Sequence, residues 1–215
     1  MITNFVDQIF IINLDERTDR LKAVTKEMEK HHLEFERFPA IKPDRSEIPE
    51  SQYNNMLGKI NKDPYVIATC GVKQSHVEII KIAKERGHKQ VLILEDDVVF
   101  TDQFENLFNI ALRELPKNWD MLFLGANHIE PFQLISSSIA RVIKAYAIHA
   151  YIIRESMYDI IIDNAIDSGE EIDVYYANSI FPNFNCYCAR PTLVWQKAGF
   201  SDIVQGFRDY KVIRK

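Results

Sequence analysis

The chain lacks the glycine-rich loops by which many nucleotide-binding proteins are recognised. Neither G-x-G-x-x-G nor G-x-x-x-x-G-K-[ST] occurs in its 215 residues, and its seven glycines are scattered. Such loops bind phosphate groups through backbone N–H groups. If a nucleotide binds to this chain, its phosphates must therefore be neutralised mainly by a cation and by side chains.

Cysteines are also few. The three that occur are Cys70, Cys186 and Cys188, and an odd, small number fits a reducing compartment better than a disulfide framework. Cys186 and Cys188 resemble half of a metal site, but no second pair of Cys or His accompanies them. We therefore expect buried free thiols.

Long apolar runs and basic stretches are missing as well. No segment approaches the ~20 apolar residues that span a bilayer, and Asp7 interrupts the N-terminus before the apolar core of a signal peptide could form. We therefore expect a cytoplasmic protein, as encoded, without a membrane span. The net charge is −5 and no stripe of Lys and Arg occurs, which argues against a nucleic-acid partner.

The composition, 47% hydrophobic and 27% charged, is that of a globular protein. Short apolar runs typical of buried strands occur at residues 8–14 (QIFIINL), 35–38, 91–94 and 121–124. Apolar residues recur at helical spacing in 18–32, 72–83 and 104–115. Residues 42–64 contain three prolines and show no period, which predicts a long loop. Beyond residue 125 the patterns predict strands in 141–153, a helix in 156–165 and a late strand in 186–195. The alternation predicts one α/β domain over 1–215, with a central, mostly parallel sheet flanked by helices.

Three adjacent carboxylates, Glu95, Asp96 and Asp97, follow the apolar run at 91–94. Open α/β sheets bind ligands at the carboxyl ends of their strands. Two such charges ~4 Å apart repel each other by about 4 kcal/mol at an effective dielectric constant of 20, and a divalent cation would remove this cost. Hard oxygen ligands favour Mg²⁺ or Mn²⁺. The alternative is that Asp96 and Asp97 cap the helix that begins after Thr101, or face water.

Several short segments, spread in order over most of the chain, resemble those of glycosyltransferase family 25. The matching pieces are Ile12-Asn13-Leu14 with Arg17, Asp19 and Arg20; residues 35–40 (FERFPA); Gly71 with Ser75-His76; residues 92–98 (LILEDDV); Trp119-Asp120; Leu124-Gly125; Ala150-Tyr151; and Pro191, Gln196 and Ser201-Asp202-Ile203. Each match alone is weak, but six or seven in register are a specific signal. The family includes bacterial lipooligosaccharide galactosyltransferases and collagen hydroxylysine galactosyltransferases.

The resemblance implies a GT-A fold, a UDP-sugar donor and a Mn²⁺ (or Mg²⁺) ion held by a D-x-D-like motif. Here the motif reads Glu95-Asp96-Asp97. Asp97 is expected to bind the metal, and Glu95 or Asp96 to lie near the ribose or the sugar. Glu95 departs from the family's aspartate, which leaves the ribose contact open. Residues 1–125 would then bind the nucleotide sugar, and residues 126–215 the acceptor.

The same resemblance assigns further residues to the donor site. They are Asn13, Leu14, Arg17, Arg20, Ala40, Gly71, Ser75 and His76. Simpler interpretations stay open for three of them. Asn13 also suits a turn at a strand end, Arg20 suits a charge pair on the surface of its helix, and His76 lies on the apolar face of its helix, as a core histidine would.

Two acids of the second half complete the candidate site. Asp202 resembles a late metal-binding or phosphate-side residue, and the alternative is an acid in a surface turn. Asp173 matches an acidic family position, so it is the candidate for the general base that an inverting transfer needs. The alternative for Asp173 is an exposed acid on a helix that begins near Glu170.

The sequence thus predicts a metal-dependent enzyme that moves galactose or glucose from UDP-galactose or UDP-glucose to a hydroxyl group. The expected acceptor is a glycan or a hydroxylysine-type side chain. Two alternatives remain: a metal-dependent nucleotide phosphohydrolase and an inactive module that binds sugar nucleotides. The apolar C-terminal half is compatible with a homodimer.

Overall fold

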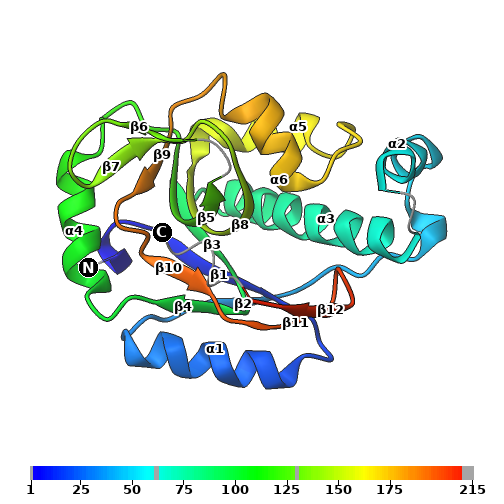
Figure 1. Cartoon of the computed structure of the whole chain (residues 1–215), viewed down its shortest axis with the longest axis horizontal. Helices are drawn as coiled ribbons and strands as arrows, with labels where there is room; N and C mark the ends of the chain where they lie inside the picture. The colour runs from blue at the N-terminus through cyan, green and yellow to red at the C-terminus, as the bar shows by residue number, and fades with distance from the viewer. Residues whose placement is uncertain (1, 61–62, 129–130, 210–215) are drawn as a thin grey trace.

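The structure is a computed structural model that describes residues 2–60, 63–128 and 131–209. The first half contains η1 (Ile2–Asn4), β1 (Gln8–Asn13), α1 (Thr18–Lys30), β2 (Glu36–Pro39), η2 (Arg45–Glu47), α2 (Glu50–Ile60), α3 (Asp63–Glu85), β3 (Gln90–Glu95), β4 (Val98–Phe100), α4 (Phe104–Glu114) and β5 (Met121–His128) (Figure 1). The second half contains β6 (Gln133–Leu134), β7 (Ile139–Arg141), β8 (Ala145–Arg154), η3 (Glu155–Met157), α5 (Tyr158–Asn164), α6 (Ile172–Tyr175), η4 (Tyr176–Ile180), β9 (Cys186–Ala189), β10 (Val194–Gln196), β11 (Gly199–Ser201) and β12 (Gly206–Arg208).

Eight strands form one central sheet in the order β2-β1-β3-β8-β5-β9-β7-β6. Strand β8 is antiparallel to both of its neighbours, and so is β7, whereas the other six strands share one direction. The predicted α/β class, with a central sheet flanked by helices, is confirmed. The expected division after residue 125 falls within β5, and both sides of it contribute strands to this sheet.

Alternating side chains of the strands build a hydrophobic core on each face of the sheet, as the two-residue period of a strand requires. In β3, Val91 and Ile93 pack into the core that α3, α5 and α6 cover. Leu92 and Leu94 pack into the opposite core, which α1 and α4 cover. Figure 1 shows α3, α5 and α6 on one side of the sheet and α1 on the other.

The prediction of a long loop over residues 42–64 is wrong. Helix α2 occupies much of this segment, and α3 begins at Asp63, well before the apolar stripe that predicted it. A small separate core stabilises the segment, formed by Ile48, Tyr53, Met56, Val66 and Cys70. The core residues come from both helices and from the segment before α2. Within α2 they are few and are separated by polar residues, so the sequence of α2 shows little helical apolar pattern.

The cysteine prediction is confirmed, because all three thiols are free and buried. Burial also raises the pKa of Cys188 to about 12, which keeps this thiol protonated and unreactive. Among the helices of the described residues, none combines the length and the apolar character that crossing a membrane requires.

Two short strand pairs lie outside the central sheet, near the carboxyl end of β3. Strands β4 and β10 pair in antiparallel fashion, with Val98 opposite Gln196. Strands β11 and β12 form a hairpin in which Phe200 faces Phe207. The backbone N–H of Lys197 also donates to the carbonyl oxygen of Asp97 over 2.7 Å. The late segment 194–208 therefore lies against the acidic end of β3.

Candidate functional site

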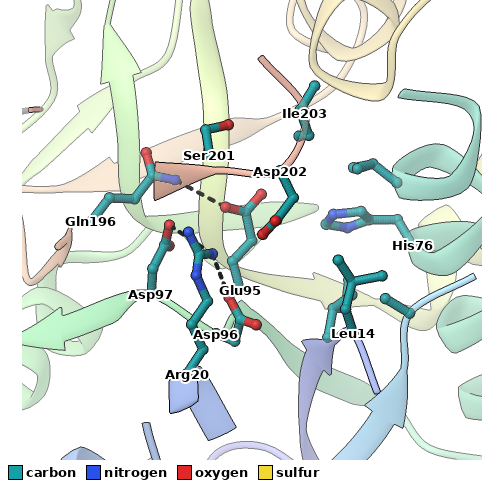
Figure 2. A pocket seen from close by; sticks show the side chains of 13 residues that line it. Leu14, Arg20, His76, Glu95, Asp96, Asp97, Gln196, Ser201, Asp202 and Ile203 are labelled. Atoms are coloured by element: carbon teal, nitrogen blue, oxygen red, sulfur yellow. Dashed lines mark hydrogen bonds and ion pairs between the residues drawn. The ribbon is translucent and has the colours of Figure 1, made fainter. Parts of the chain in front are cut away.

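The carboxyl ends of β1 and β3 lie side by side, since the two strands are parallel and Ile12 is opposite Glu95. The acids that follow β3 therefore lie beside Asn13 and Leu14 at one edge of the sheet, where open α/β sheets bind ligands. A cavity of about 140 Å³, here called the acidic cavity, opens at this edge. It is lined by Ile12, Leu14, Arg20, Ala40, Val72, His76, Glu95, Asp96, Asp97, Gln196, Ser201, Asp202 and Ile203 (Figure 2).

The three adjacent acids do not share one partner, because Arg20 contacts Asp96 and Asp97 whereas Gln196 contacts Glu95. Arg20, from α1, donates to Asp96 over 2.7 Å and approaches Asp97 at 3.4 Å. Glu95 accepts a hydrogen bond of 2.9 Å from the side-chain amide of Gln196. Figure 2 shows the Arg20 guanidinium between the carboxylates of Asp96 and Asp97. A guanidinium thus offsets part of the repulsion that we expected a metal ion to relieve.

Two of these carboxylates are nevertheless poorly compensated. Burial raises the pKa of Asp97 to about 6, although Arg20 acts in the opposite direction. Burial, and then the charges of Asp97 and Asp96, raises the pKa of Glu95 well above its usual value. The Oδ1 atom of Asp97 is buried and has no hydrogen-bond partner within the described residues. Such an orphaned oxygen is costly to bury, so Asp97 is the acid best prepared to bind an added cation.

Asn13 lies behind the cavity wall and holds two elements together. Its side-chain N–H donates to Asp96 over 2.7 Å and to the carbonyl oxygen of Arg17 over 3.2 Å. Its side-chain oxygen accepts a hydrogen bond of 3.0 Å from Arg37 in β2. Asn13 is 1% exposed, so in this structure it orients Asp96 and does not line the cavity.

Two arginines, Arg17 directly before α1 and Arg20 within it, connect this helix to the β11–β12 hairpin. Arg17 forms an ion pair with Asp202, in the turn of the hairpin, and also pairs with Asp19 at 3.0 Å. Arg20 donates to the carbonyl oxygen of Phe200 over 2.6 Å. The hairpin is therefore held over the acids by side chains that were predicted to bind the donor.

A second, more apolar cavity of about 450 Å³ adjoins the acidic cavity and shares Ile12, Leu14, Ala40, Val72, Asp202 and Ile203 with it. Its wall also contains Ser75, whose hydroxyl accepts a hydrogen bond of 2.8 Å from the backbone N–H of Ile41. Gly71 does not line it. A Cβ atom at Gly71 would lie 2.3 Å from the carbonyl oxygen of Ile41, so glycine there lets the segment after β2 approach α3.

A third cavity, here called the Asp173 cavity, also borders Glu95 and has a volume of about 190 Å³. Glu95 and Gln196 line both this cavity and the acidic cavity. Asp173 accepts hydrogen bonds from the backbone N–H groups of Ala147, at 3.0 Å, and Val174, at 2.8 Å. Its carboxylate is therefore held in place rather than free on the surface.

The structure brings eight of the predicted site residues to the wall of the acidic cavity. They are Leu14, Arg20, Ala40, His76, Glu95, Asp96, Asp97 and Asp202. Five others lie behind it or beside it, as described above: Asn13, Arg17, Gly71, Ser75 and Asp173. Whether each residue performs its predicted role stays a prediction.

Two polar residues of the site had no predicted role. Gln196 was part of the resemblance only, yet it holds Glu95, and Arg37 was not singled out, yet it holds Asn13. Arg37 could have been found from the sequence, because a cation within a short strand such as β2 needs a polar partner. Gln196 gave no such signal, because its partner is 101 residues away in the sequence.

The side chains of the described residues alone do not complete a metal site. Among residues 2–60, 63–128 and 131–209, no three His, Cys, Asp or Glu side chains form a group that could hold a metal ion. Mg²⁺ sites that also bind substrate phosphates commonly use one or two carboxylates, with the remaining ligands from phosphate and water. Asp97, with its orphaned oxygen, and Asp202 both line the acidic cavity, and their role as metal ligands stays a prediction.

The sequence of this chain is similar to those of several glycosyltransferases. A procollagen lysyl hydroxylase and glycosyltransferase of Acanthamoeba polyphaga mimivirus is 26% identical over 220 residues, which cover 88% of this chain and 25% of that protein. Procollagen galactosyltransferase 1-B of Xenopus laevis is 27% identical over 135 residues, 58% of this chain and 22% of that protein. A putative glycosyltransferase of Haemophilus influenzae is 28% identical over 107 residues, 50% of this chain and 38% of that protein. The chain thus spans about a quarter of the length of the viral and amphibian relatives.

Among solved structures, A197 from STIV has a similar fold, with a TM-score of 0.51 and 11% identity over 93% of this chain and 91% of that one. The family model for glycosyltransferase family 25 (LPS biosynthesis protein) matches residues 6–163, which is more than half of the chain. The chain belongs to glycosyltransferase family 25.

Proposed function

We propose that this chain transfers galactose or glucose from UDP-galactose or UDP-glucose to a hydroxyl group, with Mn²⁺ or Mg²⁺ at Asp97 and Asp202. The observation that carries the proposal is the sequence of three adjoining cavities. The apolar cavity and the Asp173 cavity both share lining residues with the acidic cavity, and all three meet at Val72 and Ile203. A nucleotide sugar and an acceptor bound together need this arrangement of a base pocket, a diphosphate site and an acceptor site.

The uracil and ribose would occupy the apolar cavity, against Leu14, Ala40 and Ile41. Nucleoside sites are mostly apolar with a few polar groups that fix orientation. The Ser75 hydroxyl stabilises the wall of this cavity, because it donates to the carbonyl oxygen of Gly71 over 2.7 Å and accepts from the N–H of Ile41. The diphosphate would then lie in the acidic cavity, which Arg20 also lines. Arg17, in its pair with Asp202 at the hairpin, would add a second positive charge close to that position.

A divalent ion bound there would act as a Lewis acid on the departing diphosphate. Asp97 would hold it through its orphaned oxygen, and Asp202 would contribute a second carboxylate when its pair with Arg17 is rearranged. Asp96 is less suited to this role, because Arg20 and Asn13 already use both of its oxygens. Glu95, held by Gln196 between two cavities, would lie close to the sugar.

The acceptor hydroxyl would enter the Asp173 cavity. Asp173 is the proposed general base, since two backbone N–H groups orient its carboxylate and lone pairs remain to accept the hydroxyl proton. The names of the relatives refer to procollagen, and the family description refers to lipopolysaccharide synthesis. A hydroxylated lysine side chain and a glycan hydroxyl are accordingly the two acceptor classes to test.

A UDP-release assay tests the proposal, with UDP-galactose and UDP-glucose, Mn²⁺, and panels of hydroxylysine peptides and glycans. Release that depends on both an acceptor and the metal ion supports transfer. Formation of UMP and a sugar 1-phosphate, with and without acceptor, would indicate a phosphohydrolase. UDP binding without turnover on any acceptor would indicate an inactive module. Asp97→Ala should abolish turnover. Asp102→Ala is the control and should not, because Asp102 is an exposed acid whose partner is the exposed Lys30.

A further inference from the structure

His76 lies in the wall of the acidic cavity but is buried, with 1% of its surface exposed. Its Nδ1 atom is 2.8 Å from the hydroxyl oxygen of Tyr151. Its Nε2 atom is buried and has no hydrogen-bond partner within the described residues. Figure 2 shows the ring directed from its helix toward the space beside Glu95 and Asp202. One ring nitrogen is therefore held by the protein, and the other faces the site.

Tyr151 is in turn connected to Tyr176, because their hydroxyl oxygens are 3.4 Å apart. Both tyrosines are 0% exposed. The ring of Tyr151 also stacks on His76, with centroids 5.7 Å apart. Three buried side chains from α3, β8 and η4 therefore form one chain of hydrogen-bonding groups that ends at the cavity.

The protonation states of these groups follow from burial. Burial lowers the pKa of His76 to about 4, so its imidazole is neutral at pH 7 and carries a single N–H. Burial raises the pKa of Tyr151 well above its usual value, so its hydroxyl keeps its proton. A neutral imidazole donates from one nitrogen and accepts at the other. The direction of the Tyr151 hydrogen bond therefore decides what His76 presents to the cavity.

Only one direction gives an acceptor to the hydroxyl protons of both Tyr151 and Tyr176. If His76 donated from Nδ1 to Tyr151, Tyr151 would donate to Tyr176, and the Tyr176 proton would have no acceptor among the described residues. A buried donor without an acceptor is costly. If Tyr176 donates to Tyr151 and Tyr151 donates to Nδ1, both hydroxyl protons are used. The one N–H left without a protein partner is then on Nε2, at the cavity wall, where a ligand or water can accept from it. In the other direction the unpaired proton would be on Tyr176, in the core.

We propose that Tyr176 and Tyr151 are positioning residues that hold His76 as the Nε2–H tautomer, and that this N–H donates a hydrogen bond to a diphosphate oxygen of the bound sugar nucleotide. The identity of the ligand rests on the proposed function. The tautomer does not, since it follows from the hydrogen-bond chain of the free protein. A neutral N–H suits this position, because it adds a donor for an anionic oxygen without a second proton that neighbouring carboxylates could remove.

The tautomer can be measured directly by ¹⁵N NMR of the histidine side chains in the free protein. His76→Gln assigns the His76 signals by difference. We expect a single neutral form with hydrogen on Nε2 at pH 7, and a mixture of tautomers in Tyr151→Phe, which leaves Nδ1 without its donor. A wild-type signal with hydrogen on Nδ1 would overturn the proposal, whatever the protein binds.

Calorimetry with UDP and Mn²⁺ tests the ligand. We expect Tyr151→Phe to weaken UDP binding up to about tenfold and Tyr176→Phe about threefold, as expected for the loss of a single orienting hydrogen bond. His76→Gln, whose amide N–H replaces Nε2–H, should bind UDP more tightly than His76→Phe. Tyr158→Phe is the matched control. It removes a buried hydroxyl that is not part of the His76–Tyr151–Tyr176 hydrogen-bond chain and has no partner in the described structure.

The two failures are distinguishable. If wild-type protein binds no UDP at any Mn²⁺ concentration, the proposed function and the ligand of His76 are both wrong, and the NMR result alone decides the tautomer. If wild-type protein binds UDP but Tyr151→Phe binds it as tightly as Tyr158→Phe does, the proposed function stands and the role of the two tyrosines is refuted.

Discussion

Arg20 and Asp96 form the best-buried ion pair of the acidic cavity, at 2.7 Å, with 20% and 9% of their side chains exposed. The pair joins α1 to the acids after β3 across 76 residues of sequence. Because Arg20 also approaches Asp97 and donates to the carbonyl oxygen of Phe200, one guanidinium connects two acids and the hairpin.

Replacing Arg20 should therefore destabilise the protein as well as impair binding. Arg20→Ala leaves Asp96 buried without its cation, and breaking a partly buried pair in this way costs about 3 kcal/mol. For a protein of this size, 1 kcal/mol corresponds to about 2–4 °C in Tm, so we expect a fall of roughly 6–12 °C by calorimetry. Lys30→Ala, which breaks an exposed pair with Asp102, is the control and should leave the Tm nearly unchanged. Similar small shifts for both variants would show that Arg20 is not needed to balance the acids.

The raised pKa of Asp97 predicts a stability that depends on pH. Its carboxyl titrates at about 6 in the folded protein, compared with about 4 in an unfolded chain. Between these values the folded state binds more protons, so the free energy of unfolding should fall as the pH rises from about 4 to about 6. Asp97→Asn should remove part of this decrease and raise the Tm at pH 7 by a few degrees.

This experiment should be performed with a chelator present, since a bound cation would offset the charge of Asp97. The same Asp97→Asn variant should lose metal-dependent binding of UDP. Greater stability together with lost binding is the expected signature of a site that is strained for function. A lower Tm in Asp97→Asn would contradict the electrostatic interpretation of this residue.

The parts of the fold that were predictable are those in which local pattern and tertiary environment agree. The apolar run of residues 8–14 and the run of 91–94 became the neighbouring parallel strands β1 and β3, because strands buried on both faces leave a continuous apolar signal. Their parallel pairing then brings the strand ends together. For the same reason Leu14 and the acids after β3 could be predicted to lie at one site.

What could not be predicted depends on contacts between distant segments. Helix α2 is stabilised by a core shared with α3, and its own sequence carries little apolar period. Arg20 lies between Asp96 and Asp97 because α1 packs beside β4. The sequence was compatible with a charge pair between Arg20 and a neighbour on the surface of its helix. It did not indicate that the partners of Arg20 would be Asp96 and Asp97.

Gly71 should tolerate no side chain, although it lies inside a helix. Glycine to alanine in a helix interior ordinarily stabilises by up to about 1 kcal/mol. Here a Cβ atom would lie 2.3 Å from the carbonyl oxygen of Ile41 and 3.0 Å from Cδ of Pro43. We expect Gly71→Ala to lower the free energy of unfolding by about 1–3 kcal/mol and to weaken UDP binding, because the displaced segment lines the apolar cavity.

Gly199→Ala is the matched control for Gly71→Ala, since the nearest atom to its added Cβ is 4.0 Å away. Denaturant titration of both variants measures the difference. If Gly71→Ala proves as stable as the wild type, the segment after β2 can move away from α3 at no cost, and the glycine is not required for close packing.

The pair between Arg17 and Asp202 separates two interpretations of Asp202, as an anchor of the hairpin and as a metal ligand. The side chains are 18% and 32% exposed, so a double-mutant cycle on stability should give a coupling energy of only about 0.5–1 kcal/mol. UDP binding is more informative. As a metal ligand, Asp202 should confer Mn²⁺ dependence: Asp202→Ala should bind UDP equally weakly with and without the ion, whereas Arg17→Ala should bind more weakly but still respond to Mn²⁺. If the two variants respond to Mn²⁺ alike, Asp202 acts only through its ion pair, and Asp97 would be the single carboxylate left to hold the metal.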